Sequence, residues 1–197
     1  MKIAYQGVPG SYSESCAKEN YANCETISCK TFDECFELAN NDSSVKAIIP
    51  ESNKTTGNIG VEYLIFKYRL NIFAEHFYSI KHNLLGLPGA KKEDIKDVYS
   101  HAQALSQSSN FIKKNKYNEN VRADTAGSAQ YISEKGDKTK GAIASKLSSE
   151  IYNLDIIEPN IQDDLENVTR FLIMQKEISQ PKFKDEKYVT SLLFKLK

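Results

Sequence analysis

The chain has 197 residues, and its 26 lysine and arginine residues balance its 26 aspartate and glutamate residues. A chain of this length forms one large domain or two compact lobes and buries roughly 70% of its unfolded surface, so its core needs neither disulfides nor metals. The cations are scattered among the acids, which argues against nucleic acid as the main partner, because phosphate binding needs concentrated positive charge. No apolar stretch approaches the ~20 residues that cross a bilayer, and the first residues lack the apolar run of a secretion signal. We therefore expect no membrane partner and a cytoplasmic location.

The four cysteines lie in the first fifth of the chain, at positions 16, 24, 29 and 35. Their spacing matches no paired zinc-ligand motif. We expect Cys16, Cys35 and Cys24 to behave as small buried hydrophobic residues in a reducing compartment. The sequence predicts no metal and no cofactor.

In the first half of the chain, short apolar runs alternate with helical patterns, which is typical of an α/β protein. A strand at 2–5 is followed by two capping boxes, Ser11 with Glu14 and Thr31 with Glu34. Each predicts a helix start, because the hydroxyl accepts from a free backbone N–H and the glutamate reaches back. A buried strand at 45–49 is expected to end at Pro50. Further elements are expected at 61–68 (helix), 70–74 (strand) and 79–87 (strand).

The second half repeats the alternation, with strands expected at 97–99, around 121, and at 141–144, 154–157 and 169–174. Ser100, with Gln103, is expected to cap a helix that reaches residue 112, and Ser145 to open one that ends at 152. Asp124 or Thr125 is expected to cap a helix that ends near residue 136. Residues 179–187 have the composition of a linker. The β-prone segment 188–197 fits an edge strand or the first strand of a further domain, and we favour the second.

Small polar caps follow several of the predicted strands, at Ser11, Ser100, Asp124 with Thr125, and Ser145. In an open parallel sheet these junctions gather at the carboxyl ends of the strands, where ligands bind. Helix N-termini carry free N–H groups and partial positive charge, so a converging set suits a small carboxylate. Taken singly, each cap is more often structural than functional.

The motifs of nucleotide and metal chemistry are missing. Gly7 and Gly10 lack the third glycine of a dinucleotide loop, and no Walker or H-E-x-x-H motif occurs. His76 and His82 are expected to be strand residues with local hydrogen bonds, whereas His101 has a better claim to a cleft.

Thr169 and Arg170 stand at the start of a predicted strand. Arginine can clamp a carboxylate while the neighbouring hydroxyl donates a proton. The alternative, which residue type alone favours, is an ordinary salt bridge from Arg170 to Asp163 or Asp164.

Six ordered blocks of the sequence match one known family. The chain resembles the catalytic domain of prephenate dehydratase, which converts prephenate to phenylpyruvate in phenylalanine biosynthesis. The blocks lie at 5–13, 53–57, 100–107, 124–129, 142–145 and 161–171, and so span nearly the whole chain.

The resemblance implies an α/β fold of two lobes, like the type 2 periplasmic binding proteins, with a cleft between them. One lobe would comprise about 1–78 with 161–178 and the other about 79–160. An ACT domain that binds phenylalanine as effector would follow the linker 179–187, with 188–197 as its first strand. Family members are usually homodimers or larger.

The resemblance also assigns the site. Thr169 is the hydroxyl that donates to the departing ring oxygen, while Arg170 and Phe171 have orienting and wall roles. Further substrate-binding positions are Gln6, Gly7, Asn53, Ser100, Gln107 and Thr125.

The loop at 50–57 departs from the family pattern Pro-Ile-Glu-Asn-Ser-x-x-Gly. Ser52 stands at the position of the family's glutamate, and Lys54 at that of its serine. Either Glu51 reaches in from the neighbouring position or the acid is lost. Two other functions stay open: an arogenate dehydratase, acting on the amino analogue of prephenate, and a non-catalytic module that binds a small carboxylate on the same fold.

Overall fold

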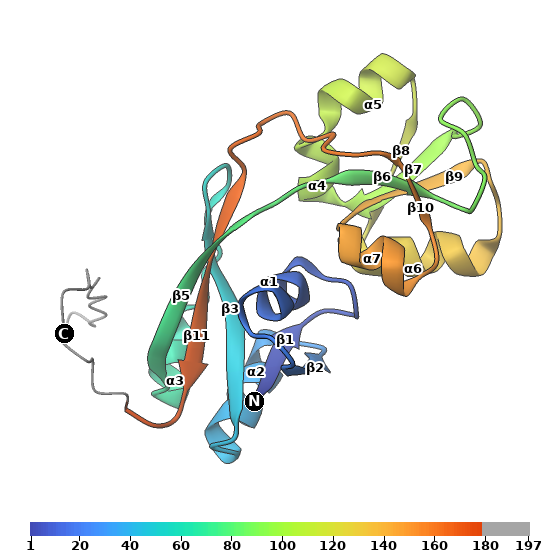
Figure 1. Cartoon of the computed structure of the whole chain (residues 1–197). Coiled ribbons are helices and arrows are strands. Elements are labelled where there is room, and N and C mark those ends of the chain that lie inside the picture. Colours follow the sequence, from blue (N-terminus) through green and yellow to red (C-terminus); the bar gives the residue numbers. More distant parts are fainter. Residues whose placement is uncertain (179–197) are drawn as a thin grey trace.

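The structure is a computed structural model that describes residues 1–178 (Figure 1). Two lobes, each built on its own sheet, are joined by two chain crossings at 80–82 and 159–167. The expected α/β architecture of two lobes is therefore confirmed. The predicted linker at 179–187 and strand at 188–197 lie outside the described residues.

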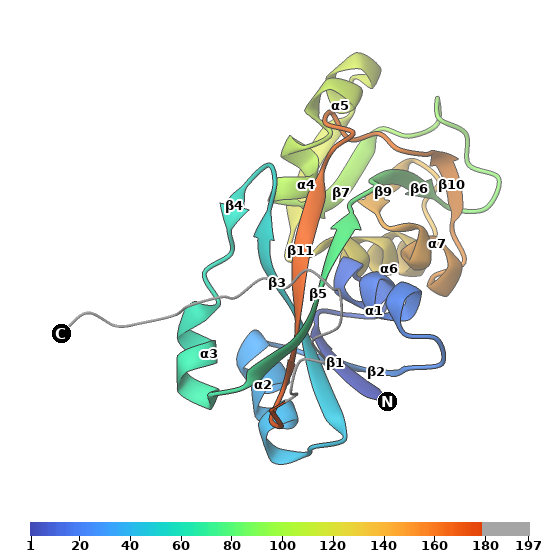
Figure 2. The same cartoon turned by 60° about the vertical axis from the view of Figure 1, so that its left-hand side comes forward.

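Lobe 1 carries both ends of the described chain on a sheet of order β2-β1-β3-β11-β5, with the short β4 paired to β3. The strands β2, β1 and β3 are parallel, whereas β11 is antiparallel to both β3 and β5. Figure 2 shows β11 and β5 running side by side toward the second lobe. The strands are β1 (Lys2–Gln6), β2 (Glu25–Cys29), β3 (Val45–Asn53), β4 (Gly57–Asn58), β5 (Asn71–Ser79) and β11 (Val168–Gln175).

Helices cover both faces of this sheet. Cys16 and Ala17 of α1 (Tyr12–Asn20) pack on one face, in a core with Phe171 and Ile173 of β11. On the other face, α2 (Phe32–Asn41) and α3 (Glu62–Tyr68) pack against alternate residues of the same strands. Because both faces are covered, adjacent residues of β11 enter different surroundings.

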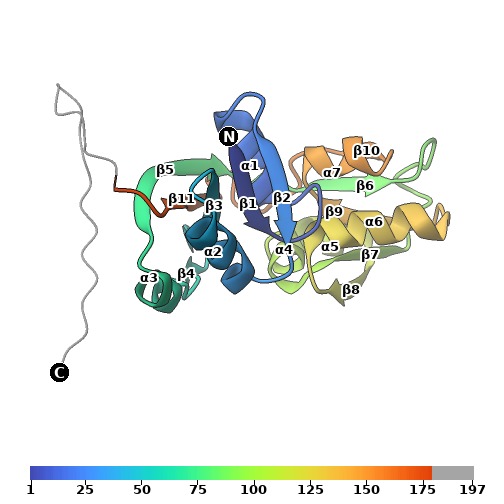
Figure 3. The same ribbon diagram turned by 90° about the horizontal axis from the view of Figure 1, so that it is seen from below.

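Lobe 2 has the sheet order β10-β6-β9-β7-β8. Here α6 (Thr125–Lys135) packs on one face and α4 (Ala102–Ser106) with α5 (Ser109–Asn115) on the other. Figure 3 shows the two lobes side by side from below. The remaining elements are β6 (Asn83–Gly86), β7 (Asp97–His101), β8 (Asn118–Arg122), β9 (Lys140–Ala144), α7 (Lys146–Ile151) and β10 (Asp155–Glu158).

Most of the predicted helix starts are confirmed. Ser11, Thr31, Asp124 and Ser145 each accept a backbone N–H of the first turn of their helix. The glutamate of the first capping box reaches back as expected, since Glu14 accepts the N–H of Gly10 at 2.7 Å.

The predicted Ser100 cap is wrong. Ser100 belongs to β7, and the cap is the ring of His101, whose Nδ1 accepts the N–H of Gln103 at 3.2 Å. The helix expected to reach residue 112 is divided into α4 and α5.

The strand at 45–49 does not end at Pro50 but continues as β3 to Asn53. Its pairing with β11 shifts register at this point, because Phe171 faces Pro50 while Arg170 faces Ser52. An irregular step in the ladder tolerates a residue without an N–H, so the proline fits inside the strand. The sequence pattern also missed β2, an edge strand whose residues are mostly half-buried or exposed.

The cysteines are free, with Cys16 and Cys35 buried and Cys24 half-buried, and Cys29 is buried as well. Within residues 1–178 no three His, Cys, Asp or Glu side chains are grouped so that they would hold a metal ion. No helix of this described part combines the length and apolar character that a bilayer crossing requires.

Candidate active site

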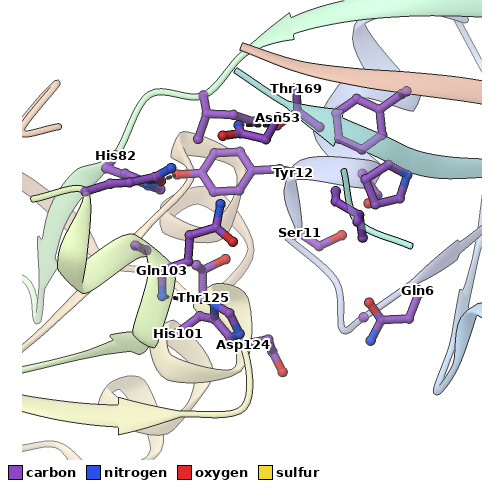
Figure 4. Close-up of a pocket in the computed structure, with 18 of the residues that line it drawn as sticks. Gln6, Ser11, Tyr12, Asn53, His82, His101, Gln103, Asp124, Thr125 and Thr169 are labelled. Carbon is purple, nitrogen blue, oxygen red and sulfur yellow. Dashed lines mark hydrogen bonds between the residues drawn. The ribbon is translucent and has the colours of Figure 1, made fainter. Parts of the chain in front are cut away.

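A cavity of about 270 Å³ lies between the lobes (Figure 4). Its walls come from the ends of β1, β3 and β7, the loop after β8, the first turn of α1, and the start of β11. This is where the carboxyl ends of parallel strands were expected to gather a site. Seven of the nine predicted site residues line it: Gln6, Gly7, Asn53, Gln107, Thr125, Thr169 and Phe171.

Thr169 and Asn53 form the centre of the lobe 1 wall. They are paired in register across β11 and β3, and both are buried. The backbone N–H of Thr55 donates to Asn53 Oδ1 at 3.0 Å, which fixes the orientation of the amide. Asn53 Nδ2 therefore donates to Thr169 Oγ1, at 2.9 Å. Since the threonine oxygen accepts this bond, its own proton is free to be donated into the cavity.

The same amide begins a chain of hydrogen bonds that crosses to lobe 2. Asn53 Nδ2 also donates to Asn167 Oδ1 at 2.8 Å, and Asn167 Nδ2 donates to Gln107 Oε1 at 3.1 Å. Gln107 Oε1 is 2.9 Å from His82 Nε2, and His82 Nδ1 is 2.7 Å from the Tyr12 hydroxyl. Because Oε1 can only accept, the direction of the chain assigns the proton to His82 Nε2 and makes Nδ1 the acceptor.

His82 and Tyr12 add no charge to this wall. Burial lowers the pKa of His82, an effect opposed by its hydrogen bond to Gln107. Burial also raises the pKa of Tyr12 well above its usual value, and Tyr78 adds to this. At neutral pH the end of the cavity around Thr169 is therefore uncharged, and hydrogen bonds are stronger in such low-dielectric surroundings.

Two further contacts tie the β3–β4 turn to α4 of lobe 2. Gln107 Nε2 donates to Thr55 Oγ1 at 2.5 Å, and Gln103 Nε2 donates to Thr56 Oγ1 at 2.9 Å. The wall that carries Thr169 is thus fixed to lobe 2 through side chains of the cavity itself.

Gly10 forms a second bridge between the lobes. Its carbonyl accepts from the hydroxyls of Ser145 and Ser148, at 2.6 and 2.9 Å. Its φ is +92°, and a Cβ here would lie 2.9 Å from Ser148 Cα. Both the backbone conformation and the close approach require glycine.

Two helix N-termini line the cavity. The first turn of α1 contributes Ser11 to Ser13, and α6 contributes its cap Asp124 and its first residue Thr125, which lie at the end remote from Thr169 (Figure 4). None of the described lining residues is lysine or arginine. Anions are favoured at such first turns, where free N–H groups and the helix dipole provide partial positive charge.

Two predicted residues are not brought to the cavity. Ser100 is 0% exposed and donates to the carbonyl of Ile143 at 2.6 Å. Arg170 lies on the opposite face of β11 from Thr169, 2.8 Å from Glu75 and 3.3 Å from Glu51. The expected salt bridge to Asp163 or Asp164 is therefore wrong in its partners.

The unusual loop residues also turn away. Glu51 accepts from the hydroxyl of Ser52 at 2.6 Å and pairs with Arg170, so it does not supply an acid to the cavity. Lys54 pairs with Glu166 at the surface, with 52% of its side chain exposed.

Sequence reasoning missed His82, Tyr12 and Gln103 as parts of one site, although it favoured His101, which does line the cavity. No local pattern marks His82, because its partners Tyr12 and Gln107 are 70 and 25 residues away. Asp124 was expected at the site as one of the converging helix caps, and it does line the cavity.

The fold and the site define a class: a two-lobed α/β protein with a cavity between its lobes, lined by helix N-termini and by a threonine hydroxyl whose proton is free. Comparisons with known protein families, sequences and structures identify the family within this class. The sequence profile of the prephenate dehydratase family, PDT, matches residues 3–179. The chain belongs to the prephenate dehydratase family.

Two plant proteins are among the similar sequences. Arogenate dehydratase/prephenate dehydratase 1, chloroplastic, of Arabidopsis thaliana is 43% identical over 197 residues, covering 100% of this chain and 50% of that protein. Arogenate dehydratase 2 of Petunia hybrida is 41% identical, with the same coverage. The chain thus spans half the length of these relatives.

Solved structures show the same fold. The prephenate dehydratase of Staphylococcus aureus subsp. aureus Mu50 has a TM-score of 0.79 at 25% identity and covers 91% of this chain and 67% of its own. GqqA, described as a novel type of quorum quenching acylase, has a TM-score of 0.85 at 30% identity and covers 91% of this chain and 66% of its own.

Proposed function

We propose that this chain catalyses the decarboxylating dehydration of prephenate to phenylpyruvate, as a step of L-phenylalanine biosynthesis. The observation that carries the proposal is the Thr169 hydroxyl, which accepts from Asn53 and keeps its proton for the cavity. The alternative substrate is arogenate, which would give phenylalanine by the same chemistry.

The reaction needs a proton donor at one end of the substrate and carboxylate binding at the other. The bond from the ring to its carboxylate breaks, and CO₂ leaves while the electron pair enters the ring. The bond to the ring hydroxyl breaks at the opposite carbon, and with one added proton the hydroxyl leaves as water. Aromatisation provides the driving force, so the enzyme mainly has to orient the substrate and assist the leaving hydroxyl.

Thr169 is suited to this assistance as a hydrogen-bond donor rather than as a strong acid, since a threonine hydroxyl is a very weak acid. The proton is ultimately supplied by solvent. The uncharged wall of Asn53, Gln107 and His82 strengthens the hydrogen bond to the departing oxygen. Phe171 and Pro50, on the same wall, offer apolar surface to the ring.

We assign residues 1–178 to the catalytic unit, with one lobe of about 1–78 and 161–178 and another of about 79–160. We propose residues 179–187 as a linker and 188–197 as part of an ACT domain. Phenylalanine would then be an effector only where that domain is complete. A homodimer or larger homo-oligomer and a cytoplasmic location remain our expectations.

Two other activities are less well supported by the site. A passive binding module would need no donor hydroxyl with a free proton. Acyl hydrolysis of the kind named for GqqA ordinarily uses a serine activated by histidine. Among the described lining residues, His82 bonds to Tyr12 and Gln107, and His101 accepts a backbone N–H, so neither activates a serine.

The test is incubation of the purified chain with prephenate at neutral pH, with phenylpyruvate quantified against an enzyme-free control. The control is needed because prephenate decays spontaneously in acid. Production above this control that is lost in Thr169→Val would support the proposal. Prephenate bound without any product from prephenate or arogenate would favour the binding module.

A further inference from the structure

The charge distribution inside the cavity is unexpected for a site that takes a dicarboxylate. Among the described lining residues, Asp124 supplies the sole carboxylate, and no lysine or arginine opposes it. None of the ion pairs within residues 1–178 involves Asp124. The cavity therefore holds a negative charge without a protein partner.

This carboxylate stands at the end of the cavity remote from Thr169. Figure 4 shows Asp124, Thr125 and His101 together on the lobe 2 side, while Thr169 and Asn53 lie at the opposite end. If Thr169 meets the ring hydroxyl, the side chain on the opposite ring carbon points to the end that holds Asp124.

Capping of α6 does not explain the charge. Asp124 Oδ1 accepts the N–H of Gly127 at 2.5 Å, which leaves Oδ2 without a hydrogen-bond donor among the described residues. Serine and asparagine cap helices as well as aspartate does, and α1 and α7 are capped by Ser11 and Ser145. One oxygen of Asp124 is therefore left to meet a ligand in the cavity.

We propose that Asp124 is a specificity-determining residue that binds the ammonium group of an α-amino acid side chain, so that this chain prefers arogenate to prephenate. The inference rests on the proposed dehydratase function and selects arogenate, the alternative substrate given above, as the preferred one. The side-chain carboxylate would accept N–H groups from the first turn of α6, beside the Thr125 hydroxyl, while Asp124 Oδ2 accepts from the ammonium.

The electrostatics favour the zwitterion over the keto acid. Prephenate places a carboxylate and an uncharged ketone at this end, so Asp124 meets only negative charge. Arogenate places an ammonium beside the same carboxylate, and a charge-assisted hydrogen bond replaces the repulsion. Discrimination comes from both effects, the new attraction and the repulsion of the competitor.

The experiment measures kcat/KM for arogenate and for prephenate with the full chain and with Asp124→Asn, which keeps the cap and removes the charge. We expect the arogenate-to-prephenate ratio of kcat/KM to exceed one in the unchanged chain and to fall about tenfold or more in the variant. Asp155→Asn is the matched control. Its carboxylate also accepts a backbone N–H in lobe 2, from Gly89 at 2.9 Å, but lies outside the cavity lining, so the ratio should not move.

The outcomes separate the two proposals. Turnover with a ratio below one, or a ratio that Asp124→Asn does not change, overturns the role of Asp124 and leaves the dehydratase function standing. Equal losses for both substrates would mean that Asp124 acts only as a cap, which also overturns it. Absence of turnover with either substrate overturns the dehydratase function, and calorimetric binding of arogenate then tests Asp124 directly, with tenfold weaker binding expected in the variant.

Discussion

Asn53 and Thr169 face each other across β3 and β11, and the amide nitrogen donates to the threonine oxygen at 2.9 Å. The direction of this bond is set by a backbone group, the N–H of Thr55, which occupies the amide oxygen. Because Thr169 accepts this bond, its own hydroxyl proton is free to be donated into the cavity, and the first two predictions depend on this direction.

Thr169→Val keeps the shape of the side chain and removes its hydroxyl. If the hydroxyl assists the departing oxygen, kcat should fall by roughly 100-fold or more, the usual contribution of a positioned proton donor. Thr169→Ser should retain a substantial part of the activity. Thr139→Val, in a turn of lobe 2 outside the cavity lining, is the control. An unchanged kcat in Thr169→Val would remove this residue from the mechanism.

Asn53→Asp tests the direction of the bond. A carboxylate still accepts the N–H of Thr55 but cannot donate to Thr169, and instead accepts the threonine proton. We expect kcat to fall by about 100-fold. Asn53 is 6% exposed, and its new oxygen would face Asn167 Oδ1, so the free energy of unfolding should also fall, by about 1–3 kcal/mol. Steady-state kinetics and denaturant unfolding measure the two effects; a variant with full kcat would contradict the assigned polarity.

His82 should make stability depend on pH. Burial lowers its pKa in the folded chain, so the unfolded chain binds the proton first as the pH falls. The stabilisation by neutral His82 is present above the ordinary histidine pKa of about 6.5 and is lost below it. The Tm, measured from pH 7.5 to 5, should therefore decline, and His82→Asn should reduce the slope.

A second histidine serves as a comparison for this measurement. Burial also lowers the pKa of His76, which is less buried than His82, so His76→Asn should change the slope in the same direction but less. Equal slopes in His82→Asn and the unchanged chain would show that His82 does not resist protonation in the fold.

Arg170→Gln should affect stability more than substrate binding. Arg170 lies behind the cavity wall, 22% exposed in its side chain, and its loss leaves Glu51 and Glu75 close together without a cation. We expect the free energy of unfolding to fall by about 1–3 kcal/mol, while KM changes less than twofold. Lys67→Gln, which breaks an exposed pair with Asp33, should change the free energy of unfolding much less, because solvent screens a surface pair. A large rise in KM with unchanged stability would return Arg170 to the substrate site.

Local patterns predicted the elements well where the signal is local. Helix caps such as Ser11, Asp124 and Ser145 depend on contacts within a few residues, so the sequence predicts them and the structure confirms them. The predicted strand end at Pro50 was wrong, because the tolerance of a strand for proline depends on the register of its partner strand. That partner, β11, lies more than 100 residues later in the chain.

By itself, the sequence determined the α/β class, most helix starts and seven residues that line the cavity, because periodicity, capping and family motifs are contained in short segments. The tertiary structure decided which face each motif residue occupies. Thr169 and Phe171 enter the cavity while Arg170 points away, and Ser100 bonds to β9 while His101 lines the cavity.

The reason is that a strand presents successive side chains to opposite faces, and only the packed lobes show which face carries the cavity. The hydrogen-bond chain from Asn53 through Gln107 and His82 to Tyr12 lies beyond any local pattern, because it joins five segments of the chain across both lobes. The charge on Asp124 likewise becomes informative only in the folded chain, because no lysine or arginine of the described residues lines the cavity beside it.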